Sequence, residues 1–163
     1  MALRRQLRLG GMAALAAVPL LASPVRAGEV WLCLTETRGD GHEVARLPAG
    51  PDGAFSLSFI HSVSRTPVTD TYHVVDGQII QTSEVFQAHG AGLPSIANDM
   101  EATGWRHENG KFIIELDRPT GPIPLRIQAQ FKNALHTANT DLPLASLGYN
   151  ALTLAPCDEE RPY

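Results

Sequence analysis

The chain has 163 residues, of which 44% are hydrophobic and 18% charged, and this length and composition predict one globular domain. Its first 27 residues hold four of the 13 basic residues and none of the 17 acidic ones, so the remainder carries 9 basic against 17 acidic side chains. A domain this acidic does not bind nucleic acid or an anionic membrane surface through its overall electrostatic field.

The N-terminus has the features of a secretory signal peptide. Three arginines within the first eight residues precede an apolar run of about eleven residues from Met12 to Ala22, which is shorter than the roughly twenty residues of a membrane span. We expect a signal peptide over residues 1–27 that is cleaved after Ala27. The mature chain, 28–163, is then one β-rich domain in the periplasm with no transmembrane span.

Short apolar runs separated by turn residues predict an all-β fold. Phe55, Leu57 and Phe59 alternate with serines, which is the period of a half-buried strand. The pattern favours a single-domain β-sandwich or a partly open barrel. The strands that we expect are Val30–Leu34, His42–Leu47, Phe55–Phe59, Thr71–Val75, Gln78–Phe86, Trp105–Glu108, Lys111–Leu116, Leu125–Phe131, Leu142–Leu147 and Tyr149–Leu154.

Two dipeptides mark hairpins, and one segment departs from the strand pattern. Asp76-Gly77 and Asn109-Gly110 each lie between apolar runs, where a tight turn needs positive φ at both central positions. Between these hairpins, Leu93 to Met100 contains a helical spacing of apolar residues that stops before Gly104. We expect one short helix or helical turn there.

Cys33 and Cys157 are the two cysteines of the chain, one near each end of the mature part. In an oxidising compartment an even pair is read as a disulfide. The alternative is that both are unpaired, buried cysteines that pack as small apolar residues.

The segment between Phe59 and Ser95 is the richest in polar side chains that could take part in catalysis or binding. A His61–Ser62 nucleophile pair is unfavourable, because neighbours in a strand point to opposite faces. If a metal is bound, its ligands would be His61, Glu84 and His89. The alternative is a partly buried His61 that is hydrogen-bonded to Asp70, Tyr72 or Glu84.

Two arginines are candidates for contact with an anion, Arg65 and Arg126, and a cross-strand partner is the alternative for Arg126. No complete catalytic motif is present, so we expect a protein that is not an enzyme and has no cofactor. The candidate binding residues are His61, Ser62, Arg65, Pro67, Asp70, Tyr72, Glu84, His89, Gly90, Gly92 and Arg126.

The motifs in this segment also resemble those of a known family. His61-Ser62-Val63, Pro67-Val68, Tyr72 and Gly90-Ala91-Gly92-Leu93-Pro94 occur in this order in small exported proteins of the DUF1850 family. The resemblance runs from about Val30 to Leu154. It departs from the family near Tyr72, where a frequent Glu is replaced by Asp70 or Thr71.

This resemblance implies a partner but no site residues. Such proteins look like companions of tripartite, ATP-independent periplasmic (TRAP) transporters of the TAXI subclass. We therefore expect a non-catalytic periplasmic accessory or binding subunit that contacts the solute receptor or the membrane subunit. The alternatives are a small-ligand or metal-binding periplasmic module, and an exported hydrolase that uses His61 as base.

Overall fold

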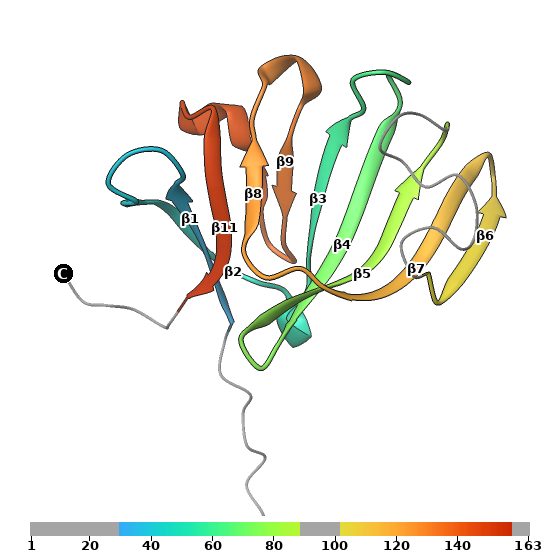
Figure 1. Ribbon diagram of the computed structural model, residues 1–163, viewed down its shortest axis with the longest axis horizontal. Helices are drawn as coiled ribbons and strands as arrows, with labels where there is room; N and C mark the ends of the chain where they lie inside the picture. The colour runs from blue at the N-terminus through green and yellow to red at the C-terminus, as the bar shows by residue number, and fades with distance from the viewer. Residues whose placement is uncertain (1–29, 89–101, 158–163) are drawn as a thin grey trace, which may run out of the picture.

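The computed structural model describes residues 30–88 and 102–157, and these residues form eleven strands in two antiparallel sheets (Figure 1). The smaller sheet has the order β2-β1-β11-β8, and the larger has the order β10-β9-β3-β4-β5-β7-β6. The strands are β1 (Trp31–Glu36), β2 (Glu43–Pro48), β3 (Phe55–Ile60), β4 (Pro67–Val75), β5 (Gln78–Phe86), β6 (Gly104–Glu108), β7 (Lys111–Pro119), β8 (Ile123–Arg126), β9 (Ala134–His136), β10 (Asp141–Pro143) and β11 (Ala151–Cys157). The prediction of an all-β sandwich is confirmed, and neither sheet closes into a barrel.

The main core lies between the two sheets, because alternate residues of each strand point into it. Leu32 and Leu154 come from the smaller sheet, and Leu57 and Leu135 come from the larger one; Leu32, Leu154 and Leu135 have no exposed surface. The side of the larger sheet that bears Leu57 and Leu135 is called its inner face below. The opposite side, which bears Ser58 and His136, is called its outer face.

The larger sheet extends past the smaller one, and it has a second apolar cluster on this extension. Strands β5, β7 and β6 lie on the side of the molecule away from β1 and β11 (Figure 1). Val68, Phe86, Ile114 and Leu116 form the buried part of this second cluster. The inner face therefore carries two apolar clusters, and the residues between them are polar.

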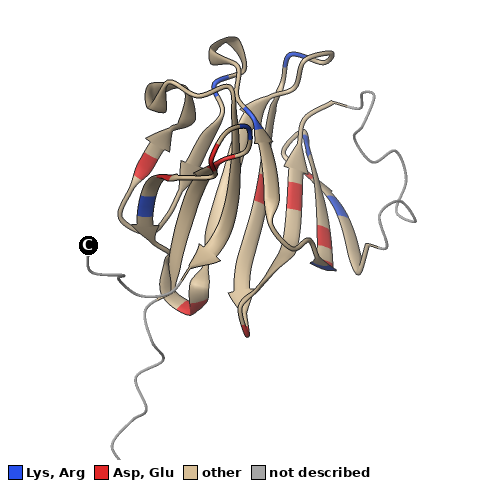
Figure 2. Ribbon diagram, turned by 60° about the vertical axis from the view of Figure 1, so that its left-hand side comes forward, with Lys and Arg blue, Asp and Glu red and all other residues tan. Residues whose placement is uncertain are grey.

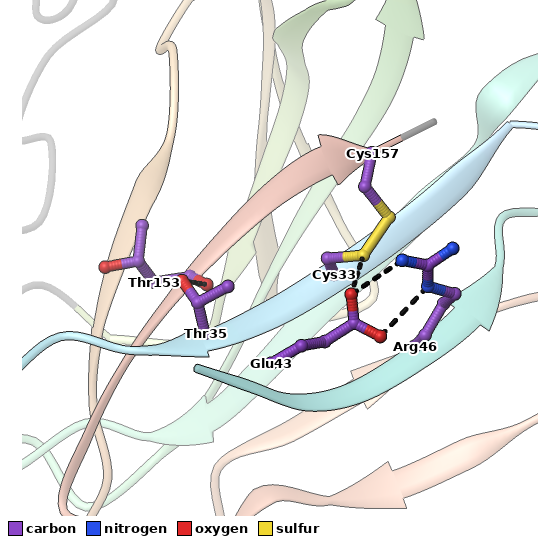
Figure 3. The surroundings of a disulfide bond; sticks show 6 residues. All are labelled: Cys33, Thr35, Glu43, Arg46, Thr153 and Cys157. Atoms are coloured by element: carbon purple, nitrogen blue, oxygen red, sulfur yellow. Dashed lines mark hydrogen bonds and ion pairs between the residues drawn. A yellow bond between two sulfur atoms is a disulfide. The ribbon is translucent and has the colours of Figure 1, made fainter. Parts of the chain in front are cut away.

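A disulfide joins β1 to β11. Of the two alternatives for the cysteines, a disulfide or two unpaired thiols, the structure contains the disulfide. Cys33 and Cys157 are 124 residues apart in the chain, with Cα atoms 5.7 Å apart. Figure 3 shows the Glu43 carboxylate against Cys33, held by two hydrogen bonds from Arg46 of 2.7 and 2.9 Å. Cross-linking a loop this long stabilises the fold by about 4 kcal/mol in the chain-entropy description.

Both predicted hairpin turns are confirmed. Asp76 and Gly77 have φ of 50° and 76°, and Asn109 and Gly110 have φ of 51° and 73°. The turns join β4 to β5 and β6 to β7, which are directly paired in the larger sheet. The predicted helical segment of residues 93–100 lies outside the described residues.

The C-terminal third differs from the prediction. The expected strand Leu125–Phe131 ends at Arg126, and Ala129–Phe131 is a short 3-10 helix that leads into Lys132 with φ of 49°. The expected strand Leu142–Leu147 is a strand only to Pro143, and Leu144–Leu147 is a second 3-10 helix. Alternation of apolar residues over so few positions fits a 3-10 turn as well as a strand.

Within the described part of the chain, no helix has the length and apolar character needed to cross a bilayer. Charged residues are sparse on both sheets, and several lie within strands and not in loops (Figure 2). These charged strand positions are the ones that matter for the site described next.

Candidate functional site

Five polar side chains interrupt the inner face between its two apolar clusters. Cross-strand pairing places Asp70 of β4 directly opposite Glu84 of β5, and places Tyr72 opposite Gln81. Gln81 in turn lies opposite Arg118 of β7. These five residues are called the polar island below. A β-bulge near Thr82 on each side of β5 shifts the register, which brings Gln81 and Arg118 onto the same face as Glu84.

The polar island is joined by hydrogen bonds that run across three strands. The Arg118 guanidinium donates to the Gln81 side-chain oxygen. The Gln81 amide nitrogen donates to Asp70 over 3.3 Å, and the Tyr72 hydroxyl donates to the same carboxylate. Gln81 and Glu84 are almost fully buried, with 2% and 6% of their surface exposed. Each buried polar group that is satisfied in this way avoids a desolvation cost of about 1–3 kcal/mol.

Burial changes the protonation of both carboxyl groups. Loss of water around Asp70 raises its pKa to about 6, although the Arg118 charge acts to lower it. Loss of water and then the neighbouring Asp70 charge raise the pKa of Glu84 to about 7. Burial also raises the pKa of the Tyr72 hydroxyl well above its usual range, so this group stays protonated. At neutral pH the two acids therefore share a fraction of a proton, most of it on Glu84.

A cleft of about 560 Å³ opens beside this island, between β3 and β8. Its polar lining includes His61, Asp70, Tyr72 and Arg126. The apolar walls come from Leu57, Phe59, Ile123, Leu125, Phe131 and Leu144. Apolar walls with a few convergent polar groups and a carboxyl of shifted pKa are the features of a small-molecule or peptide site, and the volume lies within the usual range of about 300–1,000 Å³.

A larger hollow of about 990 Å³ lies on the other side of β8, among the loops that contain Thr37 and Tyr149. Arg126 lines both spaces. The island carboxyls do not line the larger hollow. The smaller cleft is therefore the better candidate for a site.

The cleft brings together part of the predicted set of binding residues. His61, Ser62, Asp70, Tyr72 and Arg126 all line it. The predicted acidic residue Glu84 lies one strand further in, opposite Asp70.

The other predicted residues lie outside the cleft. Arg65 and Pro67 are exposed in and after the loop that joins β3 to β4, with Arg65 at φ of 60°. His89, Gly90 and Gly92 lie outside the described residues.

His61 is buried at the end of β3, with 8% of its surface exposed. Its Nδ1 accepts the backbone N–H of Ser64 over 3.1 Å and lies 3.1 Å from the Ser64 hydroxyl. The structure thus pairs this imidazole nitrogen with a residue that the sequence reasoning did not name. Ser62, its neighbour in the chain, is exposed.

Gln81 and Arg118 are functional candidates that the sequence reasoning missed. A signal for Arg118 is present in β7, because Phe112, Ile114 and Leu116 alternate and position 118 continues the same face. No comparable signal exists for Gln81, since the bulge at Thr82 breaks the alternation in β5.

The predicted metal ligands His61, Glu84 and His89 do not form a complete site in the described part of the chain. There, the potential ligand atoms that cluster within 4.8 Å of one another belong to Glu36, Asp40 and His42. Asp40 accepts hydrogen bonds from His42, which lower the Asp40 pKa. His61 and Glu84 belong to no such cluster among these residues, and His89 lies outside them.

Comparison with known proteins gives one match. A family model described as a domain of unknown function, DUF1850, covers residues 55–144, which is more than half of the chain. No curated protein and no solved structure matches the chain. The matched residues include every strand of the larger sheet, the polar island and all the residues that line the cleft. The chain belongs to the DUF1850 family.

Proposed function

We propose that this protein is an exported binding subunit, and that the cleft and the adjoining β3–β4 loop form its contact surface, at which binding and no catalysis takes place. The observation that carries the proposal is the cleft itself, which combines apolar walls with the buried side chains of His61 and Tyr72 and the half-buried carboxyl of Asp70. The cleft lies within the region that matches the family model.

The β3–β4 loop presents an exposed apolar side chain at the mouth of this cleft. Val63 is 66% exposed, and it stands between Ser62, which lines the cleft, and Ser64. The loop is held in shape by the contact between Ser64 and His61 and by a 2.8 Å hydrogen bond between the Ser64 and Thr66 hydroxyls. An apolar tip on a fixed loop supports a role in contact with a partner.

The partner that we propose is the solute receptor or the membrane subunit of a TRAP-type transporter of the TAXI subclass. The support for it is the resemblance of the sequence motifs and the signal-peptide features of residues 1–27. The acidic mature chain makes nucleic acid an unsuitable partner.

The test is affinity recovery of partners from a membrane extract of the source organism, with the tagged protein at its native level. Wild type is expected to recover a transporter subunit, and Val63→Asp is expected to lose most of it. Val75→Asp is the matched control, because Val75 is 46% exposed at the other end of β4. Absence of any transporter subunit with wild type, or equal loss in both variants, would contradict the proposal.

The second candidate is a small-ligand-binding module, which the size of the cleft and the half-buried Asp70, with its raised pKa, favour. Native mass spectrometry of protein purified from its source without chelators would then show a bound small molecule. Asp70→Asn is expected to reduce the bound fraction, whereas Asp117→Asn, an exposed acid on β7, should leave it unchanged. If the wild-type protein shows only the mass of the polypeptide, with no bound molecule, this candidate function is ruled out.

A further inference from the structure

Three side chains on the outer face of the larger sheet form a hydrogen-bonded chain in the order Ser, His, Asp. The Ser58 hydroxyl oxygen lies 2.7 Å from His136 Nε2. His136 Nδ1 lies 2.6 Å from a carboxylate oxygen of Asp141. The three residues come from neighbouring strands β3, β9 and β10.

The sheet register builds this arrangement. His136 lies directly opposite Asp141 in the β9–β10 pair and directly opposite Ser56 in the β9–β3 pair. Ser58 is two residues further along β3, so it points to the same face and reaches His136 diagonally. Ser58 and His136 are 78 residues apart in the chain, so no local motif could reveal the pair.

The two hydrogen bonds assign a direction to the chain. Because a carboxylate only accepts, Asp141 holds the imidazole proton on Nδ1, and Nε2 is left to accept the proton of the Ser58 hydroxyl. This is the arrangement in which a serine is activated by a histidine that a carboxylate orients.

The chain is accessible, and the fold does not need it to satisfy buried groups. The His136 side chain is 34% exposed and that of Asp141 is 82% exposed, while Ser58 is half-buried. An exposed hydrogen bond between side chains contributes little to stability, because water competes for both partners. The contact is therefore free to serve chemistry without a cost to the fold.

We propose that Ser58 is a nucleophile activated by His136, with Asp141 as the positioning residue, and that its substrate class is carboxylic esters with good leaving groups. This activity goes beyond the binding role proposed above. Ser58 also lines the cleft, but His136 and Asp141 do not. The variants His136→Ala and Asp141→Asn therefore test this activity apart from the binding role.

The reaction balances with water as the co-reactant. Ser58 Oγ forms a bond to the ester carbonyl carbon while its proton passes to His136 Nε2. The C–O bond to the alcohol then breaks, and His136 returns the proton to the departing oxygen. Water attacks the acyl-Ser58 by the same route, which releases the carboxylic acid and restores the serine.

The position of Ser58 within a strand limits the expected rate. The backbone of β3 pairs with β4 on one side and with β9 on the other, so the N–H groups around Ser58 are engaged in the sheet. One oxyanion donor is worth about 10²–10³ in kcat, so engaged N–H groups slow both acylation and deacylation. A good leaving group offsets this loss in acylation only, so activated esters should acylate Ser58 and deacylation should be slow. The acyl form should therefore accumulate.

The experiment is incubation with p-nitrophenyl acetate, followed by intact-mass and peptide-mapping mass spectrometry. Wild type is expected to release a burst of p-nitrophenolate and to gain one acetyl group on Ser58. Ser58→Ala and His136→Ala should lose both signals, and Asp141→Asn should slow acylation by roughly tenfold or more. Ser56→Ala is the matched control, since Ser56 shares the face and lies opposite His136.

Two results would overturn the proposal. One is an acetyl group that is absent from Ser58 in wild type. The other is acylation of Ser58 that proceeds at the wild-type rate in His136→Ala, because the imidazole would then play no part. All three residues lie at or near the surface, so each variant is expected to fold. Circular dichroism checks this.

Discussion

The larger sheet carries a hydrogen-bonded polar chain on each face, and the two chains differ chiefly in their exposure to water. On the inner face, Arg118, Gln81 and Asp70 are linked across three strands beside the buried Glu84. On the outer face, the Asp141 side chain at the end of the chain is 82% exposed. Hydrogen bonds of similar form therefore contribute differently to stability, because water competes more strongly for the outer groups than for the inner ones.

The inner chain couples the stability of the fold to pH. Asp70 and Glu84 have folded-state pKa values of about 6 and about 7, above their ordinary values of 3.8 and 4.5. An acid whose folded pKa is raised contributes its full stability below the unfolded pKa, and this contribution is lost as the pH rises through the folded pKa. We therefore expect the free energy of unfolding to fall between about pH 4 and about pH 7.

The largest effect in this comparison is expected from Arg118→Met. At pH 8 the change removes the positive charge beside two ionised carboxylates and leaves the Gln81 oxygen without its donor, which should cost about 3 kcal/mol of unfolding free energy. At pH 5 the carboxyls are mostly protonated, so the cost should be markedly smaller. Urea unfolding at both pH values measures the difference.

Arg106→Met is the matched control for this variant. Arg106 lies on β6 and makes an ion pair of 3.0 Å with Glu115, but its side chain is 51% exposed. Its loss should cost under about 1 kcal/mol at both pH values. Equal costs for the two arginine variants, or an Arg118 cost that does not change with pH, would show that the inner chain is not a buried charge network.

The second effect has the opposite sign. Glu84→Gln removes an acid whose ionisation is unfavourable in the folded state, so at pH 8 the variant should be more stable than wild type by about 1–2 kcal/mol. This advantage should disappear at pH 4.5, where wild-type Glu84 is protonated. Glu115→Gln, a more exposed position on β7, should show neither the gain nor its pH dependence. A Glu84→Gln that is less stable at pH 8 would mean that its carboxylate is favourably paired.

The inner and outer faces also differ in how far the sequence predicts them. Alternation in Phe55, Leu57 and Phe59 and the turns at Asp76 and Asn109 depend on neighbours in the chain, so strands β3 to β7 were predicted close to their observed places. Asp70, Tyr72 and Glu84 were named as candidates because they lie in the segment between Phe59 and Ser95, which is rich in polar side chains.

The contacts that complete each polar chain depend on pairing between distant segments. The bulges beside Thr82 determine that Gln81 faces Asp70, and strand β9 was not predicted at all. Three residues of sequence are too few for a periodic signal, so His136 could not be placed opposite Ser56 before the sheet order was known. The same limit applies to residues 127–131, where a 3-10 turn was predicted as strand.

The smallest effect is expected on the outer face, from Asp141→Asn. Because the side chain is 82% exposed, loss of its charge should change the free energy of unfolding by under about 0.5 kcal/mol. Thermal denaturation beside the Arg118→Met variant measures the contrast. A cost above 1 kcal/mol would mean that the outer chain supports the fold. A neutral result matters for the chemistry as well, since a slower acylation of Ser58 in a variant of unchanged stability can only come from the orientation and charge of His136.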